Sequence, residues 1–92
     1  MTTTAERTRP TPEEVLVVVR EAIAIVCEQP ASAIAADTDF DALGVDSLAR
    51  VELAELVEQR LATAAPALHI DDDDLAAFRT VGDAVDYLLV RL

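Results

Sequence analysis

Asp46 and Ser47 are the two residues whose types and position could support chemistry, because they stand where a loop-like segment meets a helix-like one. Asp is a preferred N-cap residue, so Ser47 would lie in the first turn of a helix. The free amides and the dipole at that end favour a negative group on the serine oxygen. A phosphodiester attached there would meet a helix that already accepts an anion. The same dipeptide also begins helices without any further role, and its spacing alone leaves both interpretations open.

The helix that this pair would begin runs from Ser47 to about Ala62 and has two different sides. At roughly 100° per residue, one side carries an apolar stripe that would face the core, made of Leu53, Leu56, Val57 and Leu61. The opposite side carries two aliphatic residues beside two acids, namely Leu48, Val51, Glu52 and Glu55. Exposed aliphatic side chains ringed by acids predict a docking surface. Arg50 and Arg60 project towards the buried side, where their stems can pack while their heads reach solvent.

A long first helix precedes this segment. Thr11 can cap it, Pro12 suits its first position, and Glu14 completes a capping box. The helix would continue to Gln29, because Pro30 prevents any further helical turn. Helices rather than strands are expected here because the segment between these signals is longer than strands usually are.

The rest of the chain supplies a loop, a short helix and a last helix. Residues 31–45 predict a long loop that three apolar side chains attach to the core, namely Ile34, Phe40 and Leu43. Gly44 allows the sharp turn from this loop into the next helix. A short helix is expected over residues 71–78, and Thr80 with Asp83 would cap the last one. The predicted fold class is therefore all-α, a small bundle of three main helices plus one short helix.

Length and charge limit the possible functions. The 92 residues suffice for one domain with a single core. The formal net charge is −11, from eighteen acids and seven bases, and all the bases are arginines. Such a surface repels nucleic-acid phosphates and anionic membranes, so neither is an expected partner. Proteins with basic patches are the natural complement, because opposite charges speed their encounter.

The N-terminal residues and the single cysteine both predict an intracellular protein. Residues 1–10 are polar and lack an apolar stretch, which argues against a signal peptide and predicts a disordered tail before a domain over residues 11–92. Cys27 is the single cysteine, so no internal disulfide is possible and a reducing, cytoplasmic compartment is expected. Its position late in an apolar helix predicts a buried thiol that packs as a small hydrophobe.

The segment around Ser47 resembles the phosphopantetheine attachment region of acyl carrier proteins. The residues that carry this resemblance are Phe40, Leu43, Gly44, Asp46, Ser47 and Leu48, followed by Val51, Glu52 and Leu53. The last helix, from Thr80 onwards, is also similar to that of the family. The similarity extends from Thr11 to about Leu89, which is nearly all of the chain outside the polar tail.

The resemblance implies a carrier that performs no catalysis. Ser47 would bear 4′-phosphopantetheine, transferred from coenzyme A by a phosphopantetheinyl transferase, with Asp46 helping to place the serine and Leu48 beside it. The arm would hold acyl groups as thioesters. The docking surface of Leu48, Val51, Glu52 and Glu55 would meet basic and apolar surfaces of a ketosynthase, an acyltransferase and other pathway enzymes. No catalytic residue and no resident metal are expected, and the protein would be a monomer.

Three departures from the family pattern bear on the pathway. Ala42 stands where the family often has an acid, Glu55 stands where fatty-acid carriers commonly expose an apolar residue, and the connection from Leu61 to Ile70 is longer than usual. Together with Met1 and an end soon after the last helix, they favour a discrete carrier of polyketide or other specialised biosynthesis, including antibiotic biosynthesis. A carrier of primary fatty-acid synthesis is the alternative. A peptidyl carrier is disfavoured, because those proteins usually have another residue where Asp46 stands.

Other classes of function fit the residues less well. An enzyme with a nucleophilic Ser47 would need glycines in the Gly-x-Ser-x-Gly spacing, which Gly44 does not provide. His69 lies near a loop with no evident acid partner and is expected to be a surface residue. Asp71 to Asp74 follow one another too closely for a calcium loop and suit a helix N-terminus better. A bundle that only binds other proteins, without a cofactor, would leave Ser47 without a role.

The interior is aliphatic enough to shelter an acyl chain between the helices. The expected lining consists of Ile23, Phe40, Leu53, Leu56, Val57, Ile70 and Phe78. A movable short helix near Leu75 would favour such a pocket.

Overall fold

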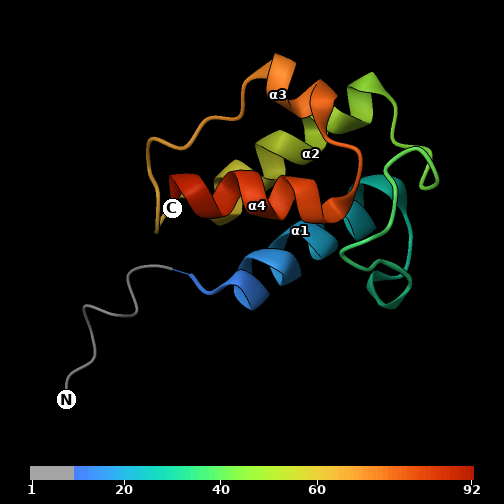
Figure 1. The fold of residues 1–92 in the computed structure, drawn as a ribbon, viewed down its shortest axis with the longest axis horizontal. Coiled ribbons are helices and arrows are strands. Elements are labelled where there is room, and N and C mark those ends of the chain that lie inside the picture. Colours follow the sequence, from blue (N-terminus) through green and yellow to red (C-terminus); the bar gives the residue numbers. More distant parts are fainter. Residues whose placement is uncertain (1–9) are drawn as a thin grey trace.

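The computed structural model describes residues 10–92, and within them the chain forms helices joined by loops (Figure 1). The elements are α1 (Pro12–Cys27), the 3₁₀ turn η2 (Ala31–Ala33), α2 (Ser47–Arg60), α3 (Asp72–Ala77) and α4 (Val81–Arg91). The only β-type pairing among these residues is an isolated antiparallel bridge between Asp39 and Thr80. The predicted all-α class with three main helices and a short one is confirmed. The expected tail lies, except for Pro10, outside the described residues.

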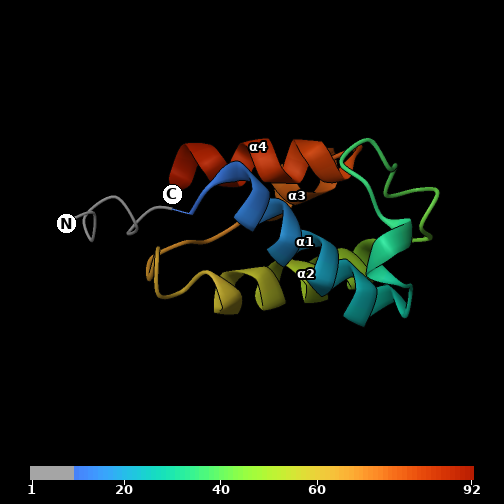
Figure 2. The same ribbon diagram turned by 90° about the horizontal axis from the view of Figure 1, so that it is seen from below.

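The helices surround a core built almost entirely from aliphatic side chains. Helix α1 packs against both α2 and α4, and α3 contacts α2 on the side away from α1 (Figures 1 and 2). Phe40 and Phe78 are the aromatic side chains buried in the core. None of the helices in the described part of the chain is long and apolar enough to cross a membrane.

Helix α1 begins as predicted and ends earlier. The Thr11 hydroxyl accepts from the Glu14 amide at 3.1 Å, and the Glu14 carboxylate accepts from the Thr11 amide at 2.9 Å, which completes the capping box. The helix ends at Cys27, two residues before the predicted Gln29. Glu28 adopts a left-handed conformation with a φ of 55°, and its amide bonds to the carbonyl of Ala24. A residue in the left-handed conformation commonly ends a helix, so Glu28 ends α1 before Pro30 could do so.

The loop between α1 and α2 is fixed at both its side chains and its backbone. Ile34, Phe40 and Val45 are buried, whereas Leu43, which was predicted to be an attachment point, is only half-buried. Leu43 still packs against the core, as predicted, and Val45 is a further buried side chain of this loop that the prediction did not name.

The backbone of the same loop bonds to the start of α4. The Gly82 amide donates to the carbonyl of Ala36 at 2.7 Å, and the Val81 amide donates to that of Thr38 at 3.0 Å. A Cβ atom at position 82 would lie 3.0 Å from the Ala36 oxygen. The close approach of these two backbones therefore favours a glycine, since a larger residue would push the Ala36 carbonyl aside.

Helix α2 presents Leu53, Ala54 and Val57 to the core, and Leu61 follows at its C-terminal end. Leu56, which was predicted to be part of this stripe, is only half-buried. The helix ends at Arg60 instead of Ala62, and turns occupy residues 61–64. The buried face of α2 therefore includes Ala54, which the predicted stripe did not contain.

Helices α3 and α4 follow in close succession. Leu75 is the buried residue of the six-residue α3. The Thr80–Asp83 capping box of α4 is present, and the helix buries Val81, Ala84, Val85 and Leu88. Leu89 of the same helix is half-buried and packs against the core.

Candidate functional site

Ser47 is the first residue of α2, and its position depends on the cap that precedes it. Asp46 has an extended backbone, and its Oδ1 atom accepts from the Ala49 amide at 2.9 Å. Its carbonyl accepts the first helical bond, from the Arg50 amide at 2.9 Å. Ser47 is exposed. A negative group on its oxygen would lie at the positive end of a 14-residue helix and in open solvent.

The approach to Ser47 depends on a turn at Gly44. Gly44 has a φ of 75°, in the left-handed region, and its amide bonds to the carbonyl of Asp41 at 3.1 Å. The Val45 amide bonds back to the carbonyl of Phe40, also at 3.1 Å. The turn buries Val45 and directs the next two residues outward, so Asp46 and Ser47 are held at the surface by a buried neighbour.

The predicted docking residues lie exposed on α2, on the side away from the core. Leu48 is 67% exposed and Val51 is 41% exposed, and they are the two exposed large apolar side chains of α2. Glu52 and Glu55 are exposed as well. One helix face thus presents two aliphatic side chains and two carboxylates, starting at the residue next to Ser47.

Arg50 lies on the same helix but takes part in a different set of contacts. Its Nη1 atom donates to the carbonyl oxygens of Leu75 at 2.6 Å and Phe78 at 3.0 Å. Its guanidinium also lies 5.0 Å from the centre of the Phe40 ring. The sequence predicted a buried stem with a solvated head, whereas the head is bound to α3. Arg60 reaches the surface as predicted, where it contacts Glu21 at 3.3 Å.

Cys27 lies at the C-terminal end of α1, within electrostatic range of Asp46. The thiol is half-buried, which corrects the prediction of a fully buried side chain. Burial, and secondly the negative charge of Asp46, raise the pKa of Cys27 above its ordinary value. The thiol is therefore protonated at neutral pH and is a poor nucleophile.

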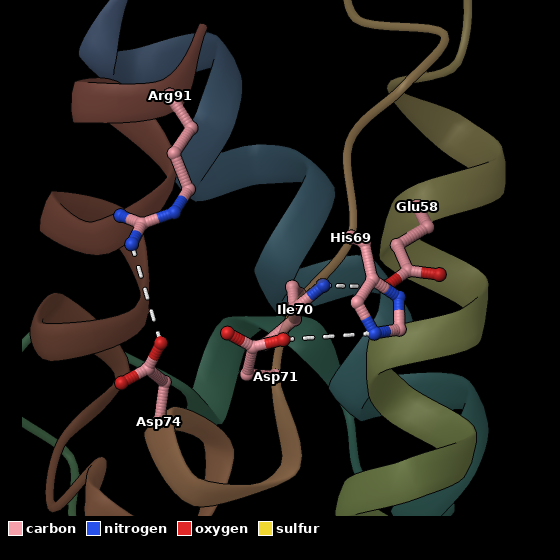
Figure 3. Close-up of polar contacts among 6 residues, drawn as sticks. All are labelled: Glu58, His69, Ile70, Asp71, Asp74 and Arg91. Atoms are coloured by element: carbon pink, nitrogen blue, oxygen red, sulfur yellow. Dashed lines mark hydrogen bonds and ion pairs between the residues drawn. The ribbon is translucent and has the colours of Figure 1, made fainter.

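His69 does have acidic neighbours, contrary to the sequence-based expectation (Figure 3). Its Nδ1 atom lies 3.5 Å from the Glu58 carboxylate and its Nε2 atom lies 3.8 Å from Asp71. The side chain is 72% exposed, as expected for a surface residue. Asp71, two residues after His69, was available to sequence reasoning and was overlooked, whereas Glu58 could not be found because it lies on α2, on the far side of a connection.

Two hollows differ in size and position. A cavity of about 10 Å³ lies under α3 and is lined by apolar side chains of all four α-helices and of the connection before α3. Leu53, Val57, Ile70 and Phe78 line it as predicted, whereas Ile23, Phe40 and Leu56 do not. A much larger open groove of about 1060 Å³ lies between the start of α1 and the end of α2. That groove contains none of the predicted site residues, so its size does not identify the site.

The acidic run Asp71–Asp74 occupies the N-terminal end of α3. Asp71 is the N-cap residue and the next three acids form the first turn, as expected from the helix dipole. Within residues 10–92, no group of three or more His, Cys, Asp or Glu side chains is arranged to hold a metal ion.

The sequence was compared with protein families and with known proteins, and both comparisons found similar proteins. Residues 17–88 match the family described as the phosphopantetheine attachment site. The chain is 38% identical over 77 residues to the acyl carrier protein of Acidothermus cellulolyticus, a match that covers 83% of this chain and 86% of that protein. It is 39% identical over 79 residues to the acyl carrier protein of Exiguobacterium sibiricum, covering 85% of this chain and 94% of that protein.

A longer relative has a more specific description. The chain is 38% identical over 79 residues to the meromycolate extension acyl carrier protein of Mycobacterium leprae. This match covers 85% of the chain but only 64% of that protein. The chain thus spans just under two thirds of the length of this relative.

Proposed function

The chain belongs to the acyl carrier protein family, whose members bear 4′-phosphopantetheine on a serine, and on this premise we propose that Ser47 is the serine that carries it. The exposed position of Ser47 at the start of α2 is the observation that supports this assignment. The chain has only one other serine, Ser32. Ser32 lies in the short turn η2, which has no side-chain cap and offers no long helix dipole to a phosphodiester.

The residues around Ser47 fit the attachment of an anionic group. The Asp46 carboxylate is engaged by the Ala49 amide, which fixes the serine at the first helical position. Gly44 lets the chain turn sharply, and the buried Val45 keeps Ser47 at the surface. When bound, the arm supplies a thiol that holds acyl groups as thioesters. The protein itself orients the arm and presents it to other enzymes, and it performs no reaction of its own.

We propose that the docking surface of Leu48, Val51, Glu52 and Glu55 is where those enzymes bind. The net charge of −11 favours partners with basic patches, and the two exposed aliphatic side chains add an apolar contact. The partners are a phosphopantetheinyl transferase, which modifies Ser47, and the ketosynthase, acyltransferase and other enzymes of the pathway that uses the acyl group.

For the pathway, we propose polyketide or related specialised biosynthesis in the cytoplasm. Support comes from the exposed Glu55, which adds a charge where carriers of fatty-acid synthesis commonly expose an apolar residue. A comparison of acceptance by a polyketide ketosynthase and by a fatty-acid ketosynthase tests the choice. Preference for the fatty-acid enzyme would assign the protein to primary metabolism instead.

The attachment is tested by intact-mass measurement. The protein is incubated with coenzyme A and a broad-specificity phosphopantetheinyl transferase. We expect the mass of one phosphopantetheinyl group to be added to the wild type and to Ser32→Ala, and none to Ser47→Ala. Modification of Ser47→Ala, or its absence from the wild type, would contradict the assignment.

A further inference from the structure

The guanidinium of Arg50 connects three segments that are far apart in the sequence. From α2 it donates to the carbonyl oxygens of Leu75 and Phe78, which lie 25 and 28 residues further along the chain. It also lies over the ring of Phe40, in the loop before α2. Leu75 belongs to the last turn of α3, and Phe78 is the C-cap residue of that helix. Arg50 therefore holds the C-terminal end of α3 against α2.

Helix α3 depends on such contacts because it is too short to be stable alone. It has six residues, whereas isolated helices shorter than about 12 to 15 residues are marginal in water. The last carbonyls of a helix also have no partners within it. A charged donor makes stronger hydrogen bonds than a neutral one, so Arg50 is well suited to satisfy them.

The other side-chain polar contacts of α3 and of the residue before it lie at the N-terminal end or at the surface. Glu58 accepts from the Ile70 amide at 2.7 Å, just before the helix begins. Arg91 lies 4.0 Å from Asp74, and both side chains are more than 40% exposed (Figure 3). An exposed pair at that distance contributes little. The C-terminal end of α3 is thus held by Arg50, by the Phe78 ring, which packs edge-on against Tyr87, and by the Arg79 carbonyl, which accepts from the Phe40 amide. Among these, Arg50 alone bonds to a carbonyl of α3 itself.

The space that α3 covers is apolar and nearly full. The cavity between α3, α2 and the core measures about 10 Å³, which is at most the space that one water molecule requires. Leu53 and Val57 of α2 line one side, and Leu75 and Phe78 line the other. An acyl chain of more than a carbon or two can enter only if a wall of this cavity moves, and the six-residue α3 is the shortest of the four α-helices that form the walls.

We propose that Arg50 is a latch on α3 that determines how readily an acyl chain enters the apolar interior. This inference rests on the proposed carrier function. Arg50 lies three residues after Ser47, hence about one turn along α2. The latch is therefore next to the point where the arm would begin. While its two hydrogen bonds are intact, short acyl groups stay outside. Longer chains enter when they break these bonds and displace α3.

The latch itself is tested on the unmodified protein by amide hydrogen exchange. The Leu75 and Phe78 amides bond to the carbonyls of Asp71 and Leu75, so they report the opening of α3. In Arg50→Met, which keeps an apolar stem, we expect these amides to exchange at least about tenfold faster, since two bonds from a charged donor are lost. Arg50→Lys should give an intermediate rate, because one ammonium can hold a carbonyl. Unchanged exchange in α3 for both variants would overturn the proposal.

A matched arginine variant separates the latch from general destabilisation. Arg60→Met removes a guanidinium from the same helix, where it makes a surface contact with Glu21. It should leave the α3 amides unchanged. In Arg50→Met the amides of α1 around Val19 should exchange as in the wild type. Equal acceleration of α1 and α3, or an equal effect of Arg60→Met on α3, would count against a local latch.

The consequence for the cargo is tested on protein loaded with butyryl or octanoyl groups. Chemical shifts of the methyl groups of Leu53, Val57 and Leu88 report entry into the interior. We expect octanoyl to shift these signals more in Arg50→Met than in the wild type, with Arg50→Lys in between. Equal shifts in the wild type and in Arg50→Met would overturn the role in cargo entry. If Ser47 accepts no arm, the proposed function fails, while hydrogen exchange on the unmodified chain still decides whether the latch exists.

Discussion

The carboxylate of Glu58 accepts a hydrogen bond from the backbone amide of Ile70 at 2.7 Å, and this bond attaches the long connection after α2 back to that helix (Figure 3). Glu58 is 24% exposed, and it also lies 3.5 Å from the imidazole of His69. The connection therefore reaches α3 from a fixed point on α2. The side chain of Ile70 is itself buried in the core.

Replacing Glu58 by Ala should destabilise the fold. The Ile70 amide is part-buried, so loss of its charged acceptor should lower the free energy of unfolding by about 1–2 kcal/mol. Glu58→Gln keeps an acceptor oxygen and should lose less. Urea unfolding with unchanged m-values measures the difference. Glu55→Ala on the exposed face of α2 is the control, and a loss there as large as in Glu58→Ala would refute the assignment.

Gly44→Ala should cost stability through the backbone alone. Gly44 has a φ of 75°, and nothing lies within 4 Å of the Cβ atom that a substitution would add. The left-handed conformation of a residue with a side chain costs about 1–2 kcal/mol. Asn tolerates this region better than Ala, so Gly44→Asn should be closer to the wild type in its thermal midpoint. Equal destabilisation by Ala and Asn would indicate a cause other than backbone strain.

Asp83 should stabilise the fold at neutral pH and cease to do so in acid. Hydrogen bonds from the backbone amides of Arg79 and Thr80 hold the pKa of Asp83 below its ordinary value. Because the pKa is depressed in the folded state, the stabilisation is present above the unfolded pKa of about 3.9 and disappears as the pH falls through the lower folded value.

The measurement is the difference in unfolding free energy between the wild type and Asp83→Ala. We expect this difference to be constant from pH 7 to about pH 5 and to shrink below about pH 4. Asp86→Ala, on the exposed side of the same helix, serves as the control. A difference for Asp83 that grows as the pH falls would have the wrong sign for this explanation.

Cys27 should react slowly with thiol reagents, and Asp46 should contribute to that slowness. Burial comes first and the Asp46 charge second among the causes that raise the pKa of Cys27. Asp46→Asn keeps a good N-cap and removes the charge, so the alkylation rate at pH 8 should rise modestly. Denatured protein should react faster than either form. A rate unchanged in Asp46→Asn would show that the charge does not reach the thiol.

Charge reversal on the proposed docking surface should weaken the encounter with a phosphopantetheinyl transferase. Glu52→Lys should raise the KM for transfer to Ser47 by about tenfold at low salt, because it places a cation opposite a basic patch. The effect should diminish as salt is added. Asp86→Lys makes the same change of charge on the exposed side of α4. If it raises KM equally, net charge rather than the α2 surface governs binding.

The local signals in the sequence predict the helix starts well, because caps are decided by neighbouring residues. Thr11 with Glu14 and Thr80 with Asp83 form the two predicted capping boxes, and Asp46 caps α2. The helix ends are less predictable. Glu28 adopts a left-handed backbone although its residue type gives no such signal.

The contacts between distant segments could not be predicted from periodicity. Arg50 was placed on the buried side correctly, but its acceptors lie on α3, whose position depends on the fold of the connection. The same reason explains why Glu58, the neighbour of His69 on α2, was not predicted. The exposure of Leu48 and Val51 was predicted correctly, since it depends only on the geometry of one helix. The roles of Ser47 and of the docking residues stay predictions until they are measured.

The backbone pairing of the loop before α2 with the start of α4 has a consequence for biosynthesis. Ala36 and Thr38 receive their donors from Gly82 and Val81, more than forty residues later in the chain. A nascent chain that has not yet released this segment from the ribosome has no partner for the loop that leads to Ser47. The segment before Ser47 therefore takes its final conformation only after residues 81 and 82 have left the ribosome and can pair with it.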